Sequence, residues 1–254
     1  MIGFAHRGAP APFQRENRLP AFRRALAAGA NGLESDVWLT ADGIPVLRHD
    51  GTLGPPGRRR RLGELRGADL PGWLPTLAAF YDDLGWGFDL SLDLKGRPDH
   101  MSAAEAAGAV LAVTRAAGGT EAAARLWLCG SFPDLHEWRQ ADGDVRLVNS
   151  TTVANVEQNG GGAAYGGILC AAGVDALNLR TREWTPPRAA MVDELHAAGI
   201  AAFGWDAQST ATLRRLRGYR LDAVYSDHLG RLIDVTVGHT RSAIGDDWPA
   251  AGSS

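Results

Sequence analysis

Short apolar runs alternate along this chain with stretches in which apolar residues recur at helical spacing. The runs predict strands at residues 2–6, 32–39, 88–94, 125–130, 145–149, 174–179, 201–205 and 223–226. Residues 45–49 are predicted to extend or pair with the second of these strands. Such alternation is typical of parallel strands joined by helical crossovers.

Helices are predicted between these strands. Leu19, Phe22 and Leu26 lie at helical spacing, with Pro20 in the first turn and Gly29 just after the end. Further helices are predicted at residues 77–84, from a cap at Asp99 to about Ala117, around Leu135 and Trp138, weakly near Ile168, from Thr185 to Gly199, around Leu213 and Leu216, and at residues 229–233.

About eight strand–helix units in a chain of 254 residues fit a closed barrel. The predicted fold class is therefore α/β, a (β/α)8 TIM barrel that forms a single domain over residues 1–238. An open doubly wound sheet is the alternative, but no Gly-x-Gly-x-x-Gly follows the first strand. The polar segment 239–254 is expected to be a loose C-terminal tail.

Residues 51–73 fit neither period and are predicted to be a loop. They hold Gly54-Pro55-Pro56-Gly57, followed by four consecutive arginines, Arg58 to Arg61. The arginines have two interpretations. They are a solvated surface run, or they form a basic rim near a functional site, because the loop leaves the carboxyl end of a strand.

Two neighbouring strands carry ionisable residues where a barrel strand should be apolar on both faces. Glu34 and Asp36 share one face of the second strand, and Asp93 and Lys95 share one face of the third. Buried charges are costly unless they are paired or bind a metal. Structural salt bridges, for instance from Lys95 to Asp93 or Glu34, are one interpretation.

The other interpretation is a metal site. The carboxylates of Glu34, Asp36 and Asp93 are hard oxygen ligands that suit one divalent cation, Mg²⁺ or Ca²⁺, better than zinc. His6 and His49 are predicted at strand ends beside this cluster, where they can serve as general acid and base.

Composition narrows the class of partner. The net charge of −3 points to neither nucleic acid nor an anionic membrane. The N-terminal segment lacks a secretory pattern, and no apolar run approaches the ~20 residues of a spanning helix. We therefore expect a cytoplasmic protein without stable membrane insertion. Cys129 and Cys170 lie in apolar stretches and are expected to be buried free thiols.

Five spaced elements near the N-terminus resemble the signature of glycerophosphodiester phosphodiesterases, which is His-Arg, then Glu-x-Asp, then His-Asp. Weaker similarities continue along the chain. The first five elements are His6-Arg7-Gly8, Glu16-Asn17, residues 32–37, residues 40–43 and residues 46–50, and the weaker ones are residues 74–77, Asp93-Leu94-Lys95, Ser131-Phe132, Gly204-Trp205 and residues 222–227.

The resemblance implies a role for each matching residue. Glu34, Asp36 and Asp93 would bind the metal, and His6 and His49 would be the acid/base pair. In addition, Arg7 and Lys95 would contact the phosphate, and Trp205 would pack against the glycerol or the leaving group. Packing in the barrel core is the alternative for Trp205. His49 is favoured as the leaving-group acid because it borders the 51–73 loop, with His6 activating the nucleophile.

Three departures from the family pattern concern the ligands and the substrate. Asp93 stands where the family usually has Glu, residues 51–73 are shorter than the cap of many bacterial members, and Trp205-Asp206-Ala207-Gln208 replaces Trp-Thr-Val-Asn. The first bears on the preferred metal, and the last bears on leaving-group preference.

The predicted function is metal-dependent hydrolysis of a small-molecule glycerophosphodiester to sn-glycerol 3-phosphate and an alcohol. Attack by water and attack by the substrate's own hydroxyl, through a cyclic phosphate, both stay open. The alternatives are phospholipase-D-like or lysophospholipase-D-like activity on longer lipids, and a non-catalytic phosphodiester-binding barrel. The oligomeric state is not predicted.

Overall fold

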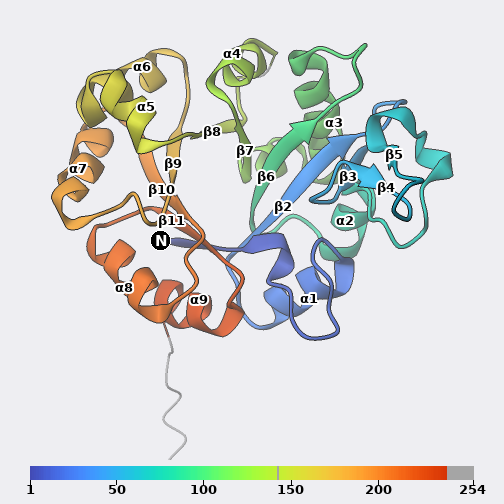
Figure 1. The fold of residues 1–254 in the computed structure, drawn as a ribbon, viewed down its shortest axis with the longest axis horizontal. Coiled ribbons are helices and arrows are strands. Elements are labelled where there is room, and N and C mark those ends of the chain that lie inside the picture. Colours follow the sequence, from blue (N-terminus) through green and yellow to red (C-terminus); the bar gives the residue numbers. More distant parts are fainter. Residues whose placement is uncertain (142, 239–254) are drawn as a thin grey trace, which may run out of the picture.

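The computed structural model describes residues 1–141 and 143–238, and within them eight parallel strands close into a barrel (Figure 1). Each strand pairs with the next along the chain, and β1 pairs with both β2 and β11, which closes the ring. The strands are β1 (Ile2–Ala5), β2 (Gly32–Leu39), β6 (Asp89–Gly96), β7 (Leu126–Gly130), β8 (Arg146–Ser150), β9 (Ala176–Arg180), β10 (Ala201–Trp205) and β11 (Ala223–Ser226). The predicted (β/α)8 barrel is confirmed. The predicted tail, residues 239–254, lies outside the described residues.

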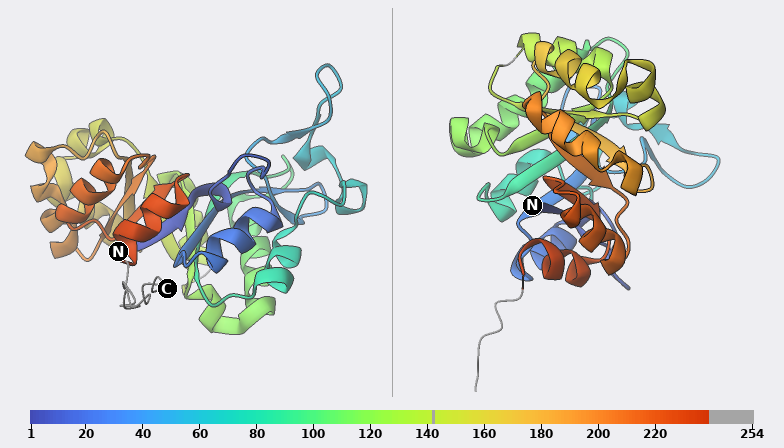
Figure 2. Two further views of the ribbon diagram at one scale, coloured as in Figure 1. Left: turned by 90° about the horizontal axis from the view of Figure 1, so that it is seen from below. Right: turned by 90° about the vertical axis from the view of Figure 1, so that its left-hand side faces the viewer.

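Helices cover the outside of the ring (Figures 1 and 2). They are α1 (Leu19–Ala27), α2 (Leu77–Leu84), α3 (Ala103–Ala123), α4 (Phe132–Ala141), α5 (Val153–Gln158), α6 (Gly161–Ala171), α7 (Ala190–Ala197), α8 (Thr210–Gly218) and α9 (Leu229–Thr236), with short 3-10 turns η1 (His6–Gly8), η2 (Leu62–Glu64), η3 (Gly67–Asp69) and η4 (Pro186–Arg188). Across the described ranges, none of these helices has both the length and the apolar character needed to cross a bilayer.

The start of α3 differs from the prediction. Ser102, and not Asp99, caps the helix, because its hydroxyl accepts a hydrogen bond from the backbone N–H of Glu105 at 3.2 Å. The Glu105 carboxylate in turn accepts from the backbone N–H of Ser102 at 2.7 Å, which completes a capping box. Non-helical backbone at Gly118 and Gly119 kinks the helix, and the helix continues beyond its predicted end.

The segment after β2 is more ordered than predicted. It holds β3 (Pro45–Leu47), which pairs antiparallel with β2, and then β4 (Thr52–Leu53) and β5 (Arg60–Arg61), which pair with each other. The prediction of a loop over residues 51–73 is therefore wrong, since this segment is a hairpin followed by η2 and η3.

A small hydrophobic cluster explains this order. Leu53, Leu62 and Leu65 are buried and pack together with Val46 and Leu74. These leucines hold both ends of the hairpin against the barrel, while its Gly-Pro-Pro-Gly tip and its arginines stay exposed.

The barrel interior is filled by aromatic side chains below the mouth. Phe4 stacks on Tyr225 with ring centroids 4.8 Å apart, and Trp127 meets Phe203 edge-on at 5.0 Å. Such bulky residues leave no channel through the barrel, so the polar residues at the carboxyl ends of the strands lie above a packed floor.

The outer core between strands and helices predicts a stability effect for Phe80. This residue is fully buried in α2 and contacts Phe22, Tyr81 and Phe88 edge-to-face. We expect Phe80→Ala to lower the free energy of unfolding by about 3–5 kcal/mol, because it leaves a cavity. Ile168→Ala, on the exposed side of α6, should cost much less. Urea denaturation measures both, and equal losses would contradict this description of the core.

Candidate active site

A cavity of about 340 Å³ opens at the carboxyl ends of the barrel strands. All of the predicted site residues except His49 line it, namely His6, Arg7, Glu34, Asp36, Asp93, Lys95 and Trp205. They come from the ends of β1, β2, β6 and β10, which is where active sites form in barrels of this type.

The three carboxylates lie on two neighbouring strands. Asp36 of β2 pairs in register with Asp93 of β6, and Glu34 pairs with Ser91. Burial raises the pKa of Glu34 to about 7, although the nearby His6 opposes that rise. Burial also raises the pKa of Asp93, against the effect of Lys95. The fold thus holds negative charge where solvation is poor.

Two cationic side chains offset this charge. The Arg7 guanidinium Nε lies 3.2 Å from the Asp36 carboxylate, and the Arg7 backbone N–H donates to Glu34 at 2.8 Å. The Lys95 ammonium donates to Asp93 and lies 3.5 Å from Asp36. Burial alone would lower the pKa of Lys95, but Asp93 and Asp36 together raise it.

The donor set is compatible with a divalent cation. Glu34, Asp36 and Asp93 supply oxygens only, and Glu34 and Asp36 are both buried in the cavity wall. In the described part of the chain, no three carboxylate, imidazole or thiol groups converge closely enough to hold a metal ion. The Asp93 carboxylate accepts from Lys95 instead, so the three residues fit a divalent cation by the chemistry of their oxygens and not by their present positions.

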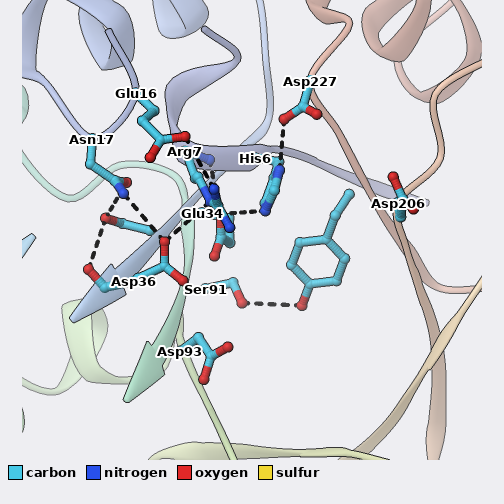
Figure 3. A network of polar contacts seen from close by, with 12 residues as sticks. His6, Arg7, Glu16, Asn17, Glu34, Asp36, Ser91, Asp93, Asp206 and Asp227 are labelled. Atoms are coloured by element: carbon cyan, nitrogen blue, oxygen red, sulfur yellow. Dashed lines mark hydrogen bonds and ion pairs between the residues drawn. The ribbon is translucent and has the colours of Figure 1, made fainter. Parts of the chain in front are cut away.

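His6 forms a contact that the sequence did not predict. Because Ala5 pairs with Ser226 in the β1–β11 register, the next residues on each strand, His6 and Asp227, lie side by side. The His6 Nδ1 is 2.7 Å from Asp227 Oδ1, and the His6 Nε2 is 3.8 Å from Glu34 (Figure 3). Burial would lower the pKa of His6, but Glu34 and Asp227 outweigh it and raise that pKa to about 9.

Asp227 is itself held in place. Gln208 donates to its second carboxylate oxygen at 2.7 Å and to Asp206 at 3.0 Å. The hydrogen bond from His6 is the main reason why the pKa of Asp227 is lowered. Neither Gln208 nor Asp227 was assigned a role from sequence. The available signals were that Asp227 ends the weakly matching segment 222–227, and that Gln208 ends the segment 205–208 that departs from the family pattern.

The turn that follows β1 has an unusual backbone. Arg7, Ala9 and Asn17 all have positive φ, at 53°, 50° and 51°. The buried Asn17 amide donates to Asp36 at 3.3 Å and accepts from the Ser35 hydroxyl at 2.8 Å (Figure 3). Left-handed backbone at non-glycine residues concentrates where function constrains the chain. Here it aims Arg7 and Asn17 at the two carboxylates of β2.

His49 lies beside the main cavity rather than in it. It lines a second cavity of about 260 Å³, together with Asn17 and Arg48. Its Nδ1 is 3.1 Å from the carboxylate of Asp50, and its side chain is partly exposed. Because Asn17 contacts Asp36, the two cavities are neighbours.

Trp205 is a surface residue of the cavity wall. Its side chain is 40% exposed and lines the cavity, so packing in the barrel core is excluded as its role. The Arg180 guanidinium lies 5.2 Å from the Trp205 ring centroid and forms an ion pair with Asp206 at 2.8 Å. Arg180 and Asp206 thus fix the tryptophan edge of the mouth.

The cavity floor is polar but unreactive. Ser91 bonds to Tyr225 at 3.1 Å and to Cys129 at 3.3 Å. Burial raises the pKa of Cys129 to about 12, which keeps it a thiol. Cys129 is buried as predicted, whereas Cys170 is exposed, so the prediction for Cys170 is wrong.

Solved structures share this architecture. Glycerophosphodiester phosphodiesterase from Thermotoga maritima superposes with a TM-score of 0.75 at 21% identity, over 92% of this chain and 97% of that one. An Oleispira antarctica phosphodiesterase in complex with the product sn-glycerol-3-phosphate gives a TM-score of 0.74 at 22% identity, with the same coverage of 92% and 97%. At these identities the similarity establishes the fold.

Sequence comparison establishes the family. A 51-residue segment is 53% identical to human glycerophosphodiester phosphodiesterase 1, but it spans only 19% of this chain and 14% of the human protein. By contrast, the model of the glycerophosphoryl diester phosphodiesterase family matches residues 6–231, from the first predicted catalytic histidine to α9. The chain therefore belongs to the glycerophosphoryl diester phosphodiesterase family.

Proposed function

We propose that this chain is an enzyme that hydrolyses glycerophosphodiesters to sn-glycerol 3-phosphate and an alcohol. The observation that carries the proposal is the charge arrangement of the main cavity. Three carboxylates, two cationic side chains and His6 face one another at the mouth of a family barrel. The match to residues 6–231 also supports a single domain over residues 1–238.

Glu34, Asp36 and Asp93 would hold one divalent cation, Mg²⁺ or Ca²⁺. When bound, the cation would polarise the phosphoryl oxygens and neutralise charge that develops there. Lys95 and Arg7, which now pair with these carboxylates, would then be available for the phosphate oxygens. The same two residues thus stabilise the free site and bind the anionic substrate.

The opposite side of the cavity offers groups for the organic part of the substrate. Asn178 is 6% exposed, and its side-chain oxygen has no hydrogen-bond partner among the described residues. Its side-chain nitrogen donates to Ser150 at 3.2 Å. The free oxygen is suited to accept a hydrogen bond from a glycerol hydroxyl, while Trp205 would pack against the carbon skeleton.

His6 and His49 would transfer the protons. One would take a proton from the attacking oxygen of water or of an adjacent substrate hydroxyl, and the other would protonate the leaving oxygen. His49 lies in the neighbouring cavity, where the leaving alcohol would extend. Both assignments of acid and base are compatible with these contacts.

A second candidate function is phospholipase-D-like or lysophospholipase-D-like cleavage of longer lipid diesters at the same site. Phe13 and Trp73 favour it. Both are exposed, and both line a third cavity that shares Arg15 and Arg18 with the His49 cavity. A panel of soluble glycerophosphodiesters and lysophospholipids, tested with Mg²⁺, Ca²⁺ and EDTA, distinguishes the candidates. Absence of turnover on every diester would leave a non-catalytic binding barrel.

The metal proposal predicts the behaviour of two isosteric variants. Glu34→Gln and Asp36→Asn should each abolish activity and strongly weaken binding of Mg²⁺ or Ca²⁺, because each removes one charged ligand. Activity assays and calorimetric titration measure the two effects, and circular dichroism checks the fold. Asp82→Asn, at an exposed position of α2, is the matched control. Full activity in EDTA after exhaustive dialysis would refute the proposal.

The histidine proposal predicts selective rescue. His6→Ala and His49→Ala should each lower kcat by about 10²-fold or more, with a smaller change in KM. A diester with a p-nitrophenolate leaving group should restore only the variant that lacks the leaving-group acid, because that group departs without a proton. His136→Ala, at an exposed position of α4, should have no effect. Equal and modest losses on both substrates would reject acid–base roles.

The His6–Asp227 contact predicts a measurable change in pKa. In the metal-free protein, Asp227→Asn should lower the pKa of His6 from its value of about 9, because the variant removes one of the charges that raise it. NMR titration of the His6 ring measures this. We also expect kcat to fall roughly 10- to 100-fold, the usual scale for groups that orient such a histidine.

Asp206→Asn is the control for this change. It alters the same hydrogen-bonded network through Gln208 but has no contact with His6. An unchanged His6 pKa in Asp227→Asn, or an equal change in both variants, would show that Asp227 does not set the charge state of His6.

A further inference from the structure

The loop between β1 and α1 presents an aromatic side chain to solvent. Phe13 is fully exposed and has a φ of 66°. Ala11 and Gln14 exchange backbone hydrogen bonds at 3.2 and 2.9 Å, which makes the turn tight and holds Phe13 at its tip. A benzyl group held outward in this way covers no core residue.

Trp73 lies close by and is surrounded by arginines. Its side chain is 50% exposed. The Arg18 guanidinium lies 3.8 Å from the Trp73 ring centroid, and that of Arg48 lies 5.7 Å away. A cavity of about 360 Å³ is lined by Phe13 and Trp73 together with Arg15 and Arg18. The two exposed aromatic rings therefore border one basic surface.

The basic surface continues along the hairpin. Arg48 donates to the backbone oxygen of Thr52 at the start of β4. Arg61 pairs with Thr52 and Arg60 pairs with Leu53, so the exposed run from Arg61 back to Arg58 extends from that point toward the tip of the hairpin. Figure 2 shows this hairpin as the blue-green loop that stands out from the body of the barrel. We call the set formed by Phe13, Arg15, Arg18, Arg48, Trp73 and Arg58 to Arg61 the basic–aromatic surface.

The arginines of this surface differ from several other exposed arginines of the chain. Arg23, for example, forms an ion pair with Asp83, and Arg188 forms one with Glu157. In residues 1–141 and 143–238, no ion pair joins an arginine of the basic–aromatic surface to a carboxylate. Burial lowers the pKa of Arg18, and its neighbours Arg48 and Arg15 lower it further, as expected for crowded like charges.

We propose that the basic–aromatic surface docks the barrel mouth onto an anionic lipid membrane. Unpaired arginines suit anionic headgroups, a tryptophan flanked by arginines suits the interfacial region, and Phe13 suits the adjoining acyl chains. A nucleic acid would use the arginines but leaves the outward phenylalanine without a role. Arg15, Arg18 and Arg48 of this surface also line the His49 cavity, so docking through them places the active-site mouth against the headgroups.

Sedimentation with vesicles tests this proposal by binding alone, independently of the proposed reaction. The whole chain is mixed with vesicles of phosphatidylcholine, or of phosphatidylcholine with phosphatidylglycerol, at low and at high salt. We expect binding to the anionic vesicles only, and loss of binding at high salt. Absence of binding to anionic vesicles at low salt would overturn the proposal.

Two variants separate the charged and the apolar contributions. Arg58→Glu with Arg59→Glu should weaken binding at least about tenfold, since each arginine near an anionic surface contributes about fivefold. Phe13→Asn should also weaken it about tenfold, because Asn tolerates the left-handed backbone but cannot insert. Neither variant alters a residue assigned to catalysis, so hydrolysis of a soluble diester should stay unchanged.

The matched control is Arg125→Glu with Arg214→Glu. It changes the net charge equally, at exposed positions just before β7 and on α8, away from the basic–aromatic surface. An equal loss of binding in this control would overturn the proposal, because net charge alone would then explain the effect. Binding of duplex DNA that competes with vesicles and does not depend on Phe13 would overturn it in favour of a nucleic-acid site.

Discussion

The cost of holding three carboxylates out of water is the constraint around which the candidate site is organised. Glu34 and Asp36 are almost fully buried, and burial shifts the pKa of Glu34 and Asp93 upward. The fold answers this with Arg7 and Lys95, whose charges meet the carboxylates directly. A cation entering the site would compete with those side chains for the same oxygens. In the proposed mechanism, the free and the metal-bound forms of the site would therefore differ mainly in the position of the positive charge.

The backbone around β1 is arranged to serve this same constraint. The left-handed residue Arg7 turns its own N–H toward Glu34, and Asn17 brings an amide to Asp36. Neither contact could be formed by a regular strand that continued into a regular helix. The strain in this turn is offset by the hydrogen bonds that it provides to the two buried carboxylates.

Local patterns in the sequence were sufficient to predict the barrel and most of the charged residues that line its mouth, because side chains two apart on a strand share a face. Contacts between distant residues were beyond such patterns, and His6 and Asp227 are 221 positions apart. The hairpin was missed because Leu53 and Leu62 follow no regular period, although both anchor it. The net charge of −3 gave no sign of the basic–aromatic surface, because Arg18 and Arg48 are 30 positions apart in the sequence and come together at Trp73 only in the folded chain.

The closure of the ring has a consequence for the order of events during synthesis. β1 leaves the ribosome before the other barrel strands, yet one of its two neighbours is β11, the last of them in sequence. Until β11 emerges, the edge of β1 is unpaired and His6 has no carboxylate from Asp227 beside it. The last barrel strand to be made thus closes the ring and also brings Asp227 into contact with His6. A nascent or prematurely terminated chain would hold Glu34, Asp36 and Asp93 without the carboxylate that contacts His6.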